Sequence, residues 1–323
     1  MVDVRIDIHW NKPIGEQSSL EFRHFVGGER ANIVPNRAEI TWLVLDGQAA
    51  GVSSSLKIYL EEYLKSNPKA DAFPLRIDTD LDSGLKQLHI TFLGKSAHGS
   101  RPHDGHNAIL DALGFFAGVP QLPRQLVRVS EFLARSCEDL NGEGFGIAGE
   151  HSFVGKTTCN LGILRIDADG ATATINVRPT LGMTVAKVVA SMRARVTAWA
   201  ATNDMRAEVQ PGATPHEALY VDPEKHQELI GALQEAYTRV TGKKATLLSK
   251  GGTTFAKAFP NAVSFGPVNP AEEEDLGHQA DECVRVDHLL RNARIYGHAL
   301  FLLSVDYKAA IRRNHLRGMG IGP

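Results

Sequence analysis

The sequence predicts a mixed α/β protein: an α+β domain with an antiparallel sheet and helices on one face, followed by part of an α/β domain. Residues 88–92 alternate between apolar and polar, as a half-buried strand does. Residues 160–168 and 171–179 flank Asp169-Gly170, a turn dipeptide typical of a β-hairpin. Apolar residues within 185–196 recur at helical spacing. Together these patterns favour strands and helices that share one sheet.

The remaining elements of the first part follow the same periodicities. Apolar residues between 56 and 64 fall at helical spacing, and the preceding run Ser53-Ser54-Ser55 offers an N-cap. A glycine-flanked loop at 94–105 follows the strand at 88–92. The order from about residue 85 to 200 is therefore strand, helix, strand, strand, helix.

A domain boundary is expected near Gln210-Pro211-Gly212, where turn residues interrupt the pattern. We expect a first, lid-type domain at 1–210, a second at 211–305 and a solvated tail at 306–323. The second domain is predicted to contain alternating elements: a helix that starts at Asp222-Pro223 and ends at Gly242, strands at 245–248 and 262–265, and a helix at 287–304. This segment is short for a complete parallel sheet.

Composition excludes several classes of protein. The chain has 323 residues, of which 43% are hydrophobic, and its 35 Lys and Arg balance 37 Asp and Glu. Without a basic excess, nucleic acid is not an expected partner. No apolar run approaches the roughly 20 residues of a membrane span, so no membrane partner is expected. The acidic N-terminal segment is no signal peptide, and the cysteines are widely spaced, which predicts reduced thiols and a cytoplasmic location.

Three short motifs favour ligands only weakly. Residues 144–149 match the glycine pattern of a dinucleotide-binding turn, but they lack the strand before and the helix after it. Gly155-Lys156-Thr157 resembles the end of a phosphate-binding loop whose first glycine is replaced by Glu150. A local metal site made by three loop histidines stays open as an alternative, although its spacing fits no standard site: His98, His103 and His106.

Four segments place polar chemistry beside glycine or proline. They are Gly28–Asn36, Gly94–Pro102, Asn176–Pro179, and the stretch from Gly251–Thr254 to Glu273–Glu282. In this order they resemble the dinuclear-zinc aminoacyl hydrolases, the family of carnosinase, peptidase V, aminoacylase and acetylornithine deacetylase. The resemblance runs from about Leu20 to Ser304 and is closest to the peptidase V branch.

The resemblance implies a role for each candidate residue. It makes His278 a terminal zinc ligand, a role that suits a neutral imidazole, and makes His98 the group that stabilises the oxyanion. It assigns to Arg178 the free carboxylate of the substrate, which a guanidinium can hold in a bidentate manner. Further contacts to this carboxylate are implied for Asn32 and for the backbone of Gly251, Gly252 and Thr253. The plain alternatives are surface histidines, an exposed strand arginine and a tight glycine turn.

The chain also departs from the family pattern. The family opens with half of a catalytic domain, which holds a His-x-Asp motif, a Glu-Glu pair with the general base, and a further Asp ligand. Only 27 residues precede Gly28 here, and they contain none of these motifs. The resemblance therefore covers a lid domain plus the C-terminal part of a zinc-peptidase-like catalytic domain, with one zinc ligand and no general base.

The function implied is that of a dipeptidase-like zinc hydrolase that cleaves an amide bond in small peptides or N-acyl amino acids. Without the N-terminal catalytic half, we expect this chain to be inactive alone. Two alternatives stay open: a non-catalytic protein that binds carboxylates or peptides, and one half of a split enzyme completed by another chain. A homodimer is compatible with each of them.

Overall fold

The computed structural model describes residues 1–12, 14, 20–80, 83–120, 122–250, 254–259, 261–266 and 283–304. The chain divides into two compact units, Met1–Ala218 and Leu219–Pro323. Residue 210, the expected end of the first domain, lies inside the last strand of the first unit, β11 (Met205–Pro211). Among the described helices, none has both the length and the apolar character that a membrane crossing requires.

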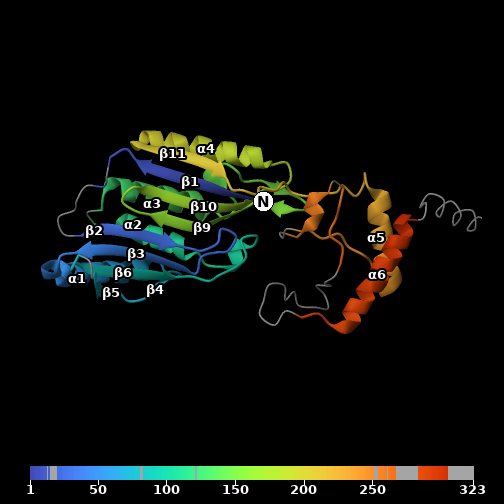
Figure 1. The fold of residues 1–323 in the computed structure, drawn as a ribbon, viewed down its shortest axis with the longest axis horizontal. Coiled ribbons are helices and arrows are strands. Elements are labelled where there is room, and N and C mark those ends of the chain that lie inside the picture. The colour runs from blue at the N-terminus through green and yellow to red at the C-terminus, as the bar shows by residue number, and fades with distance from the viewer. Residues whose placement is uncertain are drawn as a thin grey trace, which may run out of the picture. The chain divides into compact units, whose positions relative to one another are not determined.

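The first unit is built on one antiparallel sheet (Figure 1). Its strand order is β11, β1, β10, β9, β2, β3, β6 and β4, and β5 also pairs with β6. The strands are β1 (Val2–Trp10), β2 (Glu21–Gly27), β3 (Arg37–Val44), β4 (Asp71–Ala72), β5 (Arg76–Thr79), β6 (Lys86–Leu93), β9 (Thr158–Ile166) and β10 (Gly170–Arg178). A separate small hairpin pairs β7 (Glu150–His151) with β8 (Gly155–Lys156). The predicted antiparallel sheet is confirmed.

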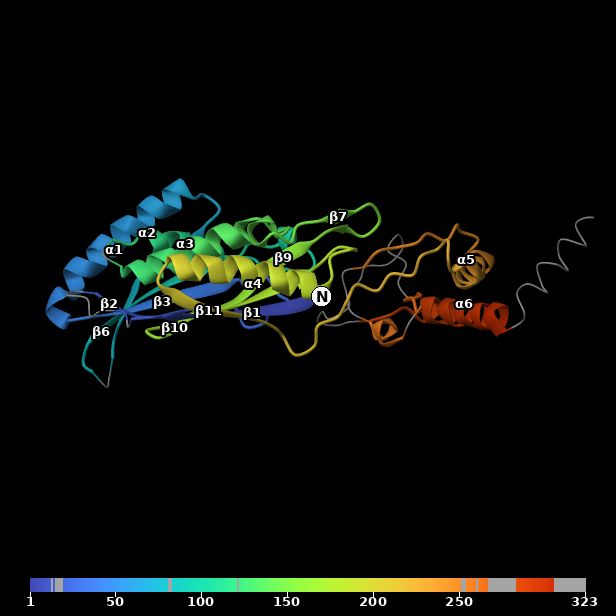
Figure 2. The same ribbon diagram turned by 90° about the horizontal axis from the view of Figure 1, so that it is seen from above.

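The helices of the first unit cover one face of this sheet, as Figure 2 shows. They are α1 (Asp46–Ser66), α2 (Ala108–Gly118), α3 (Arg124–Glu138) and α4 (Val185–Thr202). Alternate side chains of the strands, among them Trp42, Phe92 and Ile175, are fully buried in the core under these helices. Because side chains of a strand alternate between faces, their neighbours point to the other face, which we call the open face.

The sheet has two similar halves that meet at its centre. In one half the pair β2–β3 is followed by α1, and in the other the pair β9–β10 is followed by α4. The halves join where β2 pairs with β9, with Phe25 opposite Ile166. Two segments far apart in the sequence, the loop after β2 and the start of β9, thereby become neighbours.

The start of α1 differs from the prediction. The helix begins at Asp46, directly after β3, and its N-cap Leu45 makes no side-chain hydrogen bond. The serine run lies inside the helix, where Ser54 Oγ donates to the carbonyl of Ala50 at 2.9 Å. Because serine hydroxyls can satisfy themselves on the preceding turn, they do not have to mark a helix start. The predicted N-cap was therefore wrong.

The second unit contains two packed helices, α5 (Gln227–Thr241) and α6 (Val286–Ser304), and the short helix η3 (Phe255–Ala258). Its buried apolar residues form a small cluster: Ala232, Leu233, Ala236, Ile295, Ala299 and Leu302. Gly242 ends α5 in a left-handed conformation, as predicted. Asp222 does not cap α5; its carboxylate instead accepts the backbone N–H of Glu224 in the turn before the helix.

The strands predicted at 245–248 and 262–265 do not form. The described residues of the second unit contain no strand, and both segments are irregular. A strand needs a neighbour to pair its backbone N–H and C=O groups. The apolar pattern was present in the sequence, but the described part of this unit supplies no partner strand.

Candidate functional site

Two loops that the sequence analysis singled out lie against each other. The loop after β2 carries Asn32, and the loop after β6 carries His98. The N–H of Gly99 donates to the carbonyl of Asn32 at 2.7 Å, and the N–H of Val34 donates to the carbonyl of Ala97 at 2.9 Å. Ile33 and His98 form an isolated antiparallel bridge. The backbone therefore fixes the two predicted site residues beside each other.

Close packing at Gly99 brings the two loops against a third segment, the strand β10. A Cβ atom at this position would lie only 2.9 Å from Asn176 Oδ1 and 2.9 Å from the carbonyl oxygen of Asn32. Glycine alone permits this approach of the loop to β10. Asn176 lies two residues before Arg178 on the same face of the strand, so the structure gathers Asn32, His98 and Arg178 in one region of the open face.

Two polar side chains at the start of β9 hydrogen-bond to the backbone of the two loops. Asn160, which is 1% exposed, donates from Nδ2 to the carbonyls of Ala31 at 3.1 Å and Ile33 at 3.0 Å. Thr158 Oγ1 donates to the carbonyl of Gly99 at 3.4 Å. These bonds explain how polar residues on a sheet face can be buried: the two loops cover them and satisfy their hydrogen bonds.

Arg178 ends β10 directly opposite Thr158. Its guanidinium is partly buried and donates from Nε to Asn176 Oδ1 at 3.3 Å. Burial lowers the pKa of Arg178 and the nearby Asp3 carboxylate opposes this shift. Because arginine stays protonated in proteins, the site presents a fixed positive charge with donors suited to a carboxylate.

His98 is exposed, and its ring orientation is set by its own loop. Ser100 Oγ lies 2.6 Å from His98 Nδ1, and the backbone N–H of Ser100 donates to the same nitrogen at 3.4 Å. A ring nitrogen that accepts a hydrogen bond carries no proton, so neutral His98 is protonated on Nε2. This N–H is a donor that can stabilise negative charge developing on an oxygen.

The alternative of a metal site formed by His98, His103 and His106 is wrong for this structure. His106 Nε2 lies 2.5 Å from Asp111 Oδ2, and His103 Nε2 lies 3.5 Å from Asp104 Oδ1, so each ring faces its own carboxylate. Nowhere in the described residues do three or more His, Cys, Asp or Glu side chains gather in a way that could hold a metal ion.

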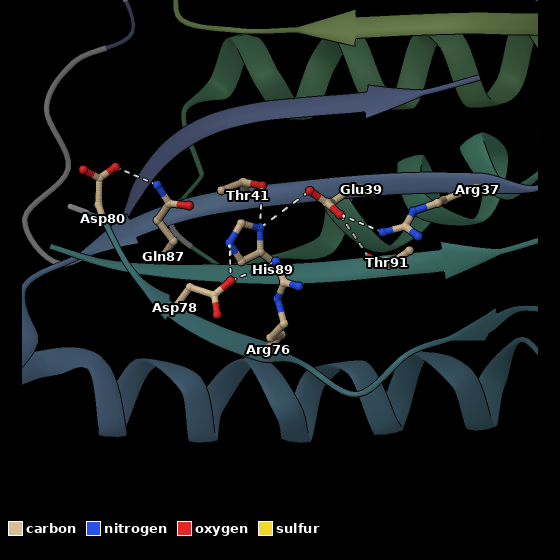
Figure 3. A network of polar contacts seen from close by, with 9 residues as sticks. All are labelled: Arg37, Glu39, Thr41, Arg76, Asp78, Asp80, Gln87, His89 and Thr91. Atoms are coloured by element: carbon tan, nitrogen blue, oxygen red, sulfur yellow. Dashed lines mark hydrogen bonds and ion pairs between the residues drawn. The ribbon is translucent and has the colours of Figure 1, made fainter. Parts of the chain in front are cut away.

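A second polar cluster lies on the open face of the other half of the sheet (Figure 3). His89 Nδ1 lies 3.0 Å from Thr41 Oγ1 and 3.6 Å from Glu39 Oε1, and its Nε2 lies 3.6 Å from Asp78 Oδ2. One imidazole between carboxylates on neighbouring strands joins the edge strand β5 to β6 and β3. These contacts connect the three strands, and the side chains do not form a group that could hold a metal ion.

Four predicted site residues lie outside the described residues: Gly251, Gly252, Thr253 and His278. Three residues of the site were not predicted, namely Asp3, Asn160 and Asn176. A signal for Asp3 was present, because residues 2–10 alternate strictly between apolar and polar. A signal for Asn176 was present as well, because it lies on the same face of its strand as Arg178, two positions later.

The chain is similar in sequence to several known proteins. Residues 82–203 match a family model described as a peptidase dimerisation domain of the M20 type. A protein of Staphylococcus epidermidis named "Putative dipeptidase" is 28% identical over 295 residues, which cover 90% of this chain and 57% of that protein. A Bacillus subtilis protein of the same description is 28% identical over 284 residues, covering 87% and 55%.

The chain thus spans little more than half the length of these relatives. Among solved structures, the aminoacylhistidine dipeptidase of Vibrio alginolyticus is similar with a TM-score of 0.43 and 13% identity, over 94% of this chain and 61% of that one. That likeness is too distant to support an argument about function.

Proposed function

We propose that the chain belongs to the M20 peptidase family and forms the substrate-binding part of a dipeptidase-like hydrolase. The bond cleaved is an amide bond in small peptides or N-acyl amino acids. The observation that carries this proposal is the meeting of Asn32, His98 and Arg178 on one region of the open face, from three separate segments. A chain that only shared the fold would not need a donor histidine and an arginine there.

We propose that Arg178 binds the free carboxylate of the substrate, with Asn32 as a second contact. The partly buried guanidinium supports this role, since reduced exposure to water strengthens a charge-assisted hydrogen bond. The Asn32 carbonyl is already bonded to Gly99, which leaves its exposed side chain as the group for the substrate. Gly251, Gly252 and Thr253 remain proposed backbone contacts.

His98 is the proposed donor to the oxyanion of the tetrahedral intermediate. Its proton sits on Nε2 while Nδ1 faces Ser100, so the donor is oriented before the substrate arrives. Preorganised donors of this kind stabilise charge in the transition state without reorganisation.

Zinc is the metal that we propose from the family resemblance, with His278 as one ligand. The described residues do not supply a zinc site, because they contain no suitable group of ligands. The general base and the other ligands are proposed to come from a complementing half of the enzyme. A second copy of this chain is the other proposed partner. A cytoplasmic location is also proposed, supported by three free cysteines, two of them buried.

The test is to fuse the catalytic half of a related dipeptidase upstream of this chain and to measure hydrolysis of a dipeptide and of its C-terminal amide. Arg178→Ala should weaken binding of the dipeptide and have much less effect on the amide. His98→Ala should lower turnover roughly 10²–10³-fold. Arg5→Ala, which removes an exposed arginine elsewhere on the open face, is the control.

The alternative function, a binding protein without catalysis, predicts a different result. The fusion would bind the dipeptide through Arg178 but would not hydrolyse it. If Arg178→Ala impaired the dipeptide and the amide equally, Arg178 would be structural and the carboxylate role would be wrong.

A further inference from the structure

The structure shows three side chains, Asp3, Asn176 and Arg178, that are linked by hydrogen bonds. Asp3 of β1 lies directly opposite Asn176 of β10 in the sheet register. Asn176 Nδ2 donates to Asp3 Oδ1 at 2.6 Å, and Asn176 Oδ1 accepts from Arg178 Nε at 3.3 Å. We infer that Asp3, acting through the buried amide of Asn176, is a positioning residue that fixes the guanidinium of Arg178 for a carboxylate ligand. This inference rests on the proposed function.

The donors and acceptors of these three side chains permit only one orientation of the Asn176 amide. An ionised Asp3 can only accept hydrogen bonds, and the guanidinium of Arg178 can only donate them. The amide of Asn176 therefore has to give its NH₂ group to Asp3 and its oxygen to Arg178. The carboxylate at one end thus determines which atom the amide presents at the other end.

Burial makes this arrangement rigid. Asn176 is 0% exposed, so water does not replace either partner. Its oxygen also lies against Gly99, the residue after His98, where even one added carbon would come within 2.9 Å. The same amide therefore connects Asp3, Arg178 and the His98 loop, and rotation of this amide would disturb the two functional segments together.

Charge supports the same role. Burial lowers the pKa of Arg178, and the Asp3 carboxylate acts in the opposite direction. Asp3 reaches the guanidinium through Asn176, so its negative charge compensates the buried positive charge of Arg178 from one residue away.

The test uses the full chain and two readouts. Exchange of the Arg178 Nε proton, measured by ¹⁵N NMR and assigned with Arg178→Lys, reports how firmly the guanidinium is held. Titration with glycylglycine and with glycylglycine amide reports carboxylate binding. Asp3→Asn keeps the shape of the side chain and removes its charge, and it also permits the amide of Asn176 to flip.

Asp7→Asn is the matched control. Asp7 lies on the same strand and accepts from Thr172 Oγ1 of β10 at 2.8 Å, so it forms an equivalent cross-strand bond that does not lead to Arg178. Asp3→Asn should accelerate exchange of the Nε proton and weaken glycylglycine binding, each on the order of tenfold, whereas glycylglycine amide should bind unchanged. Asp7→Asn should leave both readouts as in the unmodified chain.

The inference is wrong if Asp3→Asn leaves exchange of the Arg178 Nε proton at the wild-type rate. It is also wrong if Asp7→Asn changes this rate as much as Asp3→Asn does. Asn176→Ala should have a larger effect than Asp3→Asn, but Asp3→Asn decides the question if the alanine variant does not fold. If glycylglycine binds the unmodified chain and Arg178→Ala equally, the proposed role of Arg178 fails, and the Nε exchange still judges the positioning role separately.

Discussion

Gly99 donates its backbone N–H to the carbonyl oxygen of Asn32 over 2.7 Å. This bond holds together two loops from different parts of the sequence, and it does so at the place where a side chain on Gly99 would collide with β10. The relative position of Asn32 and His98 therefore depends on backbone packing at one glycine.

Gly99→Ala should separate these loops. The added Cβ would meet a backbone oxygen and a buried amide oxygen that both have fixed positions, and overpacking of this kind costs about 1–3 kcal/mol. Urea unfolding should show this loss, and binding of glycylglycine should weaken with it. Gly51→Ala is the control, since its Cβ would meet nothing within 4 Å. Equal stability of the two variants would contradict the packing argument.

Asn160→Ala should destabilise the first unit for a different reason. The substitution leaves the carbonyls of Ala31 and Ile33 without the donor that now lies between them. Buried groups that lose their partner cost about 1–3 kcal/mol. Asn67→Ala removes an exposed amide at the end of α1 and should change the free energy of unfolding by less than about 0.5 kcal/mol. Equal effects would mean that Asn160 does not support the loops.

Recognisable motifs in the sequence singled out Asn32, His98 and Arg178, which the structure places in one region, and their roles stay predictions. The sequence assigned no role to Asp3 or Asn176, because their role depends on the pairing of β1 with β10, and these strands lie far apart in the sequence. The alternation in residues 2–10 was visible, but no local pattern tells which strand will be its neighbour. The same dependence on neighbours explains why the strands at 245–248 and 262–265 were predicted and do not form.

The pH dependence of stability should include a contribution from His24. Burial lowers the pKa of His24, and the positive charges of His89 and Arg23 act in the same direction, while Glu39 opposes them. The unfolded chain therefore binds a proton more readily than the folded one, so this contribution is present above pH about 6.5 and is lost as the pH falls through the lowered pKa.

His24→Gln should therefore reduce the fall in unfolding free energy between neutral pH and about pH 5. Urea unfolding at a series of pH values measures this difference. His9→Gln, a histidine elsewhere on the open face, serves as the comparison. If His24→Gln leaves the pH dependence unchanged, burial of His24 does not contribute to it.

Thiol labelling should distinguish the three cysteines by their rates of reaction. Burial raises the pKa of Cys159 to about 12 and raises that of Cys137 well above its usual value, whereas Cys283 is exposed. Because the thiolate is the reactive form, iodoacetamide at pH 8 should modify Cys283 first. Cys137 and Cys159 should react only when the first unit unfolds. Cys283→Ser should abolish the fast phase, and a fast phase that persists in this variant would contradict the burial of the other two thiols.

The second unit should open before the first one. Its core consists of the small cluster between α5 and α6, and α6 leaves Leu289, Leu300 and Phe301 exposed, at 57%, 70% and 62%. So little buried apolar area stabilises the helices only weakly. In hydrogen exchange, amides of α5 and α6 should exchange by a local opening at lower free energy than amides of β9 and β10.

Leu233→Ala, in the cluster, should accelerate exchange in both helices, because packing on Leu233 is shared between them. Leu300→Ala removes a side chain that is already exposed, so it should not accelerate exchange in either helix. Equal protection of the two units in the unmodified chain would show that the second unit is stable by itself.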